Sequence, residues 1–81
     1  MLELYQRIAL SHELPEHNLK KGDVVTLVDY VTHPSGGENG YVLEVFNAVG
    51  ESIDVIAVPM SAVQPLRNDE ILTVRSLAKA S

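Results

Sequence analysis

The sequence of 81 residues contains no cysteine, no tryptophan and only one phenylalanine. Without cysteine the chain has neither disulfide bonds nor thiolate metal sites, which is consistent with a cytoplasmic protein. No apolar run approaches the roughly 18 to 20 residues that span a bilayer. The opening MLELYQRIAL also lacks the basic residues and the long apolar stretch of a signal peptide. These absences predict a cytoplasmic protein with no membrane segment.

Positive charge is also scarce. Six Lys and Arg residues face eleven Asp and Glu residues, so the net charge is −5. A surface of this sign repels nucleic-acid backbones and anionic lipids, which disfavours both as partners. A chain of this length encloses only one small core, and its stability is expected to be marginal unless a second chain associates with it.

Three stretches favour β-strands. Residues 23–31 (DVVTLVDYV) are rich in β-branched side chains and carry apolar groups on both faces, which suits a bent strand in a small barrel. Residues 41–46 alternate, with Tyr41, Leu43 and Val45 on one face, and we predict that Glu44 faces water. Residues 52–58 (SIDVIAV) form the third strand, up to Pro59.

The connections complete the outline. Residues 47–50 predict a hairpin turn with a positive φ at Gly50, and residues 60–66 predict one helical turn followed by a short strand. Residues 2–10 fit a helix or a strand, and residues 11–22 are typical of a loop. The tail fits a helix from Asn68 or an extended piece, and we favour the second.

This order of elements predicts an all-β fold, a five-stranded SH3-like barrel with one short helical turn and a variable C-terminal tail. The expected domain covers residues 1–81, with a core at about 4–66 and a tail at 67–81.

Several of these segments also resemble a known family. The turn Lys21-Gly22-Asp23, the pair Leu14-Pro15, the strand at residues 41–46 and the closing residues 63–66 are similar to a bacterial family of short SH3-like proteins, domain of unknown function 4926. Residues 70–75 resemble its cyanobacterial members. The resemblance implies the fold and brings no catalytic residues. Val25 stands where many members have glycine, which bears on local strand curvature.

The loop HPSGGENG, residues 33–40, raises the question of a phosphate site. A phosphate-binding P-loop needs a lysine after its glycines and a helix behind it, because the lysine and the backbone amides hold the phosphates. Here Gly36, Gly37 and Gly40 precede a strand, and no lysine follows them. Asn39-Gly40 instead tolerates positive φ angles, so we interpret the loop as a bend between strands.

Other candidate sites carry weaker signals. The histidines at positions 12, 17 and 33 lie in polar segments without metal-binding spacing, so we expect no metal and no cofactor. The carboxylates near strands fit solvent-facing alternation better than an acid–base pair; they are Asp23, Asp29, Glu44 and Asp54. Ser35, Ser52 and Ser61 lack the strand-to-helix elbow of an activated nucleophile. The sequence therefore predicts a protein that is not an enzyme.

The run from Val55 to Val58, followed by Met60, places apolar side chains on both faces of one strand. We expect Ile56 and Val58 to be exposed in a monomer, where they meet a partner or are covered by Ile71, Leu72 and Val74. The predicted function is a protein-interaction module, in an accessory or antitoxin-like role, that binds another protein or a second copy of itself. The predicted contact residues are Tyr30, Ile56, Val58 and Met60.

An alternative starts from Lys20-Lys21-Gly22-Asp23, which resembles the opening of the KOW-type barrels found in ribosome- and polymerase-associated proteins. In that hypothesis the domain binds nucleic acid through Lys20, Lys21, Arg67 and Arg75. The few aromatic residues and the negative net charge weigh against it.

Overall fold

A computed structural model describes residues 2–33 and 35–77 of the chain. Its elements, in chain order, are β1 (Arg7–Leu10), η1 (Pro15–His17), β2 (Val24–Val31), β3 (Gly40–Phe46), β4 (Ser52–Pro59), η2 (Met60–Ala62) and β5 (Val63–Pro65). The two η elements are short 3₁₀ turns. No helix among the described residues is long and apolar enough to cross a membrane.

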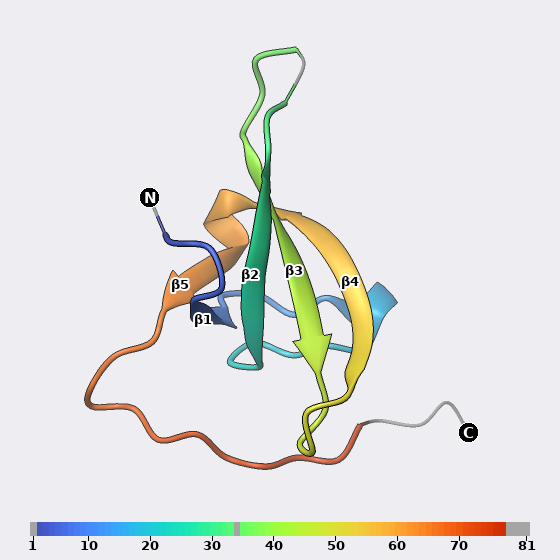
Figure 1. Cartoon of the computed structure of the whole chain (residues 1–81), viewed down its shortest axis with the longest axis vertical. Coiled ribbons are helices and arrows are strands. Elements are labelled where there is room, and N and C mark those ends of the chain that lie inside the picture. Colours follow the sequence, from blue (N-terminus) through green and yellow to red (C-terminus); the bar gives the residue numbers. More distant parts are fainter. Residues whose placement is uncertain (1, 34, 78–81) are drawn as a thin grey trace.

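The strands form one antiparallel sheet in the order β4-β3-β2-β1-β5. Consecutive strands from β1 to β4 are neighbours, and β5 returns to pair with β1, as expected for an SH3-like barrel (Figure 1). Within the described part of the chain no pairing joins β4 to β5, so the barrel remains open along that line. The all-β, SH3-like prediction is confirmed, with the sheet curved but not closed.

One apolar cluster fills the concave side of this sheet. Its most deeply buried side chains come from the first three strands and are Ile8, Leu10, Val25, Leu27 and Leu43. The predicted alternation in β3 is confirmed, since Tyr41, Leu43 and Val45 are buried. Glu44 lies on the opposite face and is half-buried rather than fully exposed.

β2 is bent, as its two-faced apolar pattern predicts. The pairing with β3 matches Leu27 to Leu43 and then Asp29 to Val42, so Val28 is an extra residue in a β-bulge. A bulge increases local twist and allows one strand to turn along the curved sheet. Val25 lies in the regular part of β2 and fills the core.

The predicted faces of β4 are wrong. Ile56 and Val58 are buried, with 4% and 6% of their surfaces exposed, because they pair with the core residues Leu43 and Tyr41 of β3. In a strand, a shift of one residue moves every side chain to the other face. A second bulge, between Val45 and Phe46, separates this pairing from the turn and makes its register hard to infer from the sequence.

The predictions for the remaining segments agree with the structure only in part. Gly50 has a φ of +87°, and η2 followed by β5 appears where one turn and a short strand are expected. The ambiguous opening contains a strand, β1, and the segment expected to be only a loop contains the turn η1, where Pro15 starts a 3₁₀ turn. In the tail, residues 66–77 are neither helix nor paired strand.

Candidate interaction surface

The loop between β2 and β3 is organised around the side chain of His33. Its Nδ1 atom accepts hydrogen bonds from the backbone N–H groups of Ser35 and Gly37, each at 3.1 Å, and its carbonyl oxygen accepts the N–H of Gly36 at 3.3 Å. A phosphate cradle would need these amides to be free. Because His33 already occupies them, the interpretation of the loop as a bend is the one that fits the structure.

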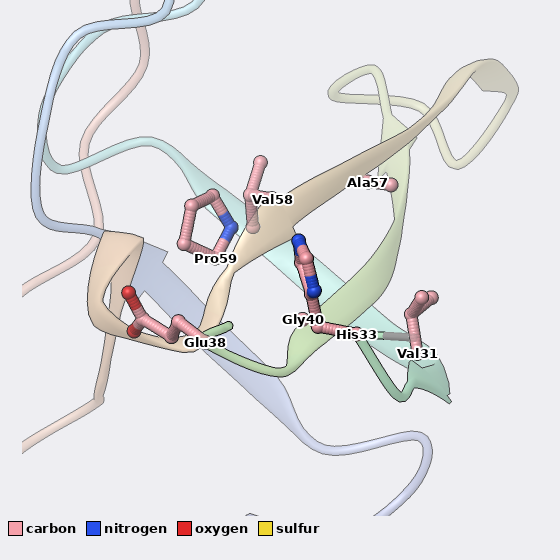
Figure 2. Close-up of a pocket in the computed structure, with 7 residues that line it drawn as sticks. All are labelled: Val31, His33, Glu38, Gly40, Ala57, Val58 and Pro59. Atoms are coloured by element: carbon pink, nitrogen blue, oxygen red, sulfur yellow. The ribbon is translucent and has the colours of Figure 1, made fainter. Parts of the chain in front are cut away.

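The same loop is fastened to η2. Glu38 accepts the N–H of Ser61 at 2.8 Å and its hydroxyl at 3.2 Å, and the carbonyl oxygen of Asn39 accepts the N–H of Met60 at 3.0 Å. Figure 2 shows the imidazole of His33 directed toward β4, and the carboxylate of Glu38 on the other side of Pro59. An open cavity of about 260 Å³ lies between these side chains.

The glycines of this loop act differently from the prediction. The positive φ falls at Gly36, with +78°, and not at Asn39-Gly40. Gly40 is needed for space instead, since a Cβ atom there would lie 2.7 Å from the backbone carbonyl oxygen of Val58. β3 and β4 therefore approach each other closely at this position.

The four predicted contact residues do not form one exposed surface. Ile56 and Val58 belong to the core, and Met60 is half-buried against it. Tyr30 is exposed, but its ring packs against Tyr41 with 5.8 Å between centroids, and its hydroxyl donates to the carbonyl oxygen of Leu2. The prediction that Ile56 and Val58 are exposed is corrected by their burial.

The exposed apolar side chains of β4 are those of the alternate positions. Ile53 and Val55 have 43% and 57% of their surfaces exposed, Ala57 is exposed as well, and Phe46 of the neighbouring strand adds a further exposed ring. We call Ile53, Val55 and Ala57 the β4 strip. It lies on an edge strand, because β4 pairs only with β3 within the described part of the chain.

The backbone of this edge is partly occupied. The N–H of Val55 donates to Oδ1 of Asp54, the preceding residue of the same strand, at 2.9 Å. Along an antiparallel strand every second residue directs its N–H and C=O to the same side, so the backbone groups of Val55 and Ala57 share one side of β4. Oδ2 of Asp54 also lies 3.6 Å from Nδ1 of His17 in η1. Any unoccupied stretch of this edge therefore begins after the N–H of Val55.

Asp23 and Arg75 form an ion pair in which the pKa of each group is shifted toward its charged form. The guanidinium donates to both carboxylate oxygens, with Nε 2.9 Å from Oδ1, and 29% and 20% of the Arg75 and Asp23 side-chain surfaces are exposed. Hydrogen bonds from Arg75 lower the pKa of Asp23 despite its partial burial, and the backbone N–H of Lys20 adds to the effect. This contact joins the tail to the start of β2.

Two of the four cations proposed for nucleic-acid binding are therefore paired. Arg75 binds Asp23, and Arg67 binds Asp69 through two hydrogen bonds at 3.0 and 2.8 Å. Lys20 and Lys21 precede β2 and are exposed. No three His, Asp or Glu side chains come together as a metal site anywhere in residues 2–33 and 35–77.

Positive and negative residues are unevenly distributed along the chain, which the net charge alone does not show. Residues 22–66 contain no lysine or arginine but six carboxylates, at positions 23, 29, 38, 44, 51 and 54. The strands β2, β3 and β4 lie within this stretch. The free edge at β4 is thus acidic as well as apolar, a signal present in the sequence that a total net charge does not reveal.

In a comparison with protein families, the domain of unknown function DUF4926 matches residues 4–65 of the chain. The chain belongs to this family. The matched residues include all five strands and end at the last residue of β5, whereas the tail lies outside them. No curated protein and no solved structure matches the chain.

Proposed function

We propose that this DUF4926 domain is a non-enzymatic protein-interaction module that presents the free edge of β4 and the β4 strip to another polypeptide. The exposure of Ile53 and Val55 on a strand paired on one side only carries the proposal. An extended segment that adds to such an edge gains backbone hydrogen bonds, and alternate side chains supply specificity. The expected setting is the cytoplasm.

The charge around the edge indicates the kind of partner. Glu44 lies beside Val55 across β3 and β4, and Glu51 and Asp54 flank the start of the strip. Because no lysine or arginine lies between residues 22 and 66, a partner with basic side chains next to apolar ones is favoured over an acidic one.

Several groups with catalytic potential are engaged in structural contacts, which supports a binding role. Both His33 and Glu38, which line the cavity of Figure 2, hold backbone N–H groups, and Asp23 holds Arg75. A general base needs a lone pair that can reach a substrate proton. Arg67 and Arg75 are likewise committed to carboxylates, so the interaction with protein is preferred to one with nucleic acid.

The test compares two single substitutions in the tagged full-length chain. Val55→Glu adds a charge to the β4 strip, and Leu4→Glu adds one to a similarly exposed apolar residue before β1. After native extraction, quantitative mass spectrometry should find a protein that the wild type and Leu4→Glu retain and that Val55→Glu loses. Thermal melts should show that both variants fold.

Two results would contradict the proposal. One is a strict monomer from which no protein co-purifies with the wild type. The other is an associated protein that Val55→Glu retains as fully as the control does, since the contact would then lie elsewhere.

A further inference from the structure

The tail crosses the lower end of the sheet and leaves a groove beside it. It runs from β5 beneath the strands to the turn between β3 and β4 (Figure 1). Between the tail and the body lies a groove of about 750 Å³ whose lining includes Arg7, Val24, Phe46, Val49 and Ile53. We call this groove, together with residues 71–77, the tail face.

The tail itself forms an apolar ridge along the groove. Ile71 and Val74 have 88% and 87% of their surfaces exposed, and Leu72 and Leu77 are about half exposed. After Glu70 no backbone–backbone hydrogen bond involves the tail within the described residues. Holding an extended chain costs conformational entropy, and an isolated tail recovers little of it when its apolar side chains face water.

Seven of the twelve large exposed apolar side chains of the described residues line this groove or lie on the tail; they are Phe46, Val49, Ile53, Ile71, Leu72, Val74 and Leu77. Monomeric proteins rarely expose contiguous apolar patches of large size. A second chain that covers this end would bury the ridge and fill the groove together.

We propose that the tail face binds a second copy of this chain, with Ile71 and Val74 of each copy entering the groove of the other. A two-fold contact requires one patch that contains both a projecting part and its complement, so that each copy supplies both. The ridge and the groove lie next to each other on the same end of the molecule, which meets this requirement.

Charge favours a second copy here and disfavours one at β4. Arg7 lines the groove without an ion-pair partner among the described residues, and Glu70, whose Oε1 accepts the backbone N–H of Arg67 at 2.6 Å, immediately precedes Ile71, so the groove and the start of the tail carry opposite charges. Asp23 and Arg75 neutralise each other. Two β4 edges would instead bring like carboxylates together.

Sedimentation equilibrium of the full chain over a range of concentrations tests the proposal. The wild type should form a dimer, and Ile71→Asp with Val74→Asp should weaken it by about tenfold or more. Arg7→Glu should weaken it as well, and the combination of Arg7→Glu with Glu70→Arg should restore it. Circular dichroism should show the same fold for every variant.

The tail face shares Ile53 with the β4 strip but contains neither Val55 nor Ala57, so a substitution at Val55 separates the two surfaces in the same experiment. Val55→Glu should leave the dimer intact. A wild type that stays monomeric, a dimer that survives the tail substitutions, or a charge exchange that fails to restore association would overturn the tail-face dimer. A dimer abolished by Val55→Glu alone and unaffected by the tail substitutions would place the self-contact at β4 and also overturn it.

Discussion

The β2–β3 loop and the C-terminal tail are both exposed segments without strands, but they are attached to the sheet by different means. The loop is polar, and its polar groups bind one another and η2 through His33, Glu38 and Asn39. The tail carries exposed apolar side chains, and its main bond to the body is the pair Arg75–Asp23.

The difference teaches which segment is available for binding. A loop whose amides are already paired has few groups left for a ligand, although its glycines make it resemble a site. A tail whose apolar side chains have no cover still has free energy to gain from contact with another surface. The glycine-rich β2–β3 loop, which resembles a binding site in the sequence, therefore has a structural role.

The largest loss of stability is expected from a substitution at the end of the β2–β3 loop. Gly40→Ala places a Cβ atom 2.7 Å from the carbonyl oxygen of Val58, and backbone atoms cannot move aside easily. The free energy of unfolding, measured with urea, should fall by about 1–3 kcal/mol. Gly36→Ala, which meets open space at a φ of +78°, should cost about 1 kcal/mol. A larger loss at Gly36 than at Gly40 would contradict the close approach of the strands.

A smaller effect is expected when the acceptor inside the loop is removed. His33→Ala leaves the N–H groups of Ser35 and Gly37 to water, so stability should fall by about 1 kcal/mol or less. Amide hydrogen exchange at Ser35 and Gly37 should become faster. His12→Ala, at an exposed residue outside this network, is the matched control. Unchanged exchange at both amides would show that His33 does not hold the loop.

The smallest effect on stability is expected where the tail is attached. Arg75→Gln should change the free energy of unfolding by about 1 kcal/mol or less, because a single partly exposed ion pair contributes little. NMR should nevertheless show the tail becoming mobile. Arg67→Gln, which breaks a pair contained within residues 67–69, should leave residues 71–77 in place. A tail that stays ordered without Arg75 would mean that its apolar contacts are sufficient.

The same bond gives a pH dependence with a definite sign. Arg75 lowers the pKa of Asp23 below its ordinary 3.8, so the ionised carboxylate is favoured in the folded state. Its contribution is complete above the unfolded pKa and is lost as the pH falls below 3.8 toward the folded value. Arg75→Gln should make this acid-dependent step in the stability profile smaller, since only Lys20 then lowers the pKa of Asp23, and a step of unchanged size in the variant would assign it to another group.

Much of the fold follows from the sequence because its signals are local. Alternation in β3, the turn at Gly50 and the stop near Pro59 each depend on a few neighbouring residues. The faces of β4 could not be predicted in this way, since Ile53, Val55, Ile56 and Val58 are all apolar. Their orientation depends on the register with β3, and a bulge next to Phe46 separates that register from the turn.

The candidate surfaces could not be predicted from the sequence for the same reason, since they depend on strand register and on contacts between distant residues. The sequence correctly indicates that β4 has apolar side chains on both faces. It assigns the faces the wrong way round, because Ile56 and Val58 are buried and Val55 is exposed. The position of the tail depends on Arg75 and Asp23, which are 52 residues apart. No local sequence pattern predicts a contact between residues so far apart in the chain.

The carboxylate of Asp54 affects whether strands of other chains can pair with the edge of β4. It already holds the N–H of Val55, and Pro59 at the far end of β4 has no N–H to offer. An incoming strand thus finds a template only a few residues long, too short to propagate copy after copy into a fibre. Asp54 and Pro59 together therefore disfavour repeated edge-to-edge pairing while one side of β4 stays without a partner strand among the described residues.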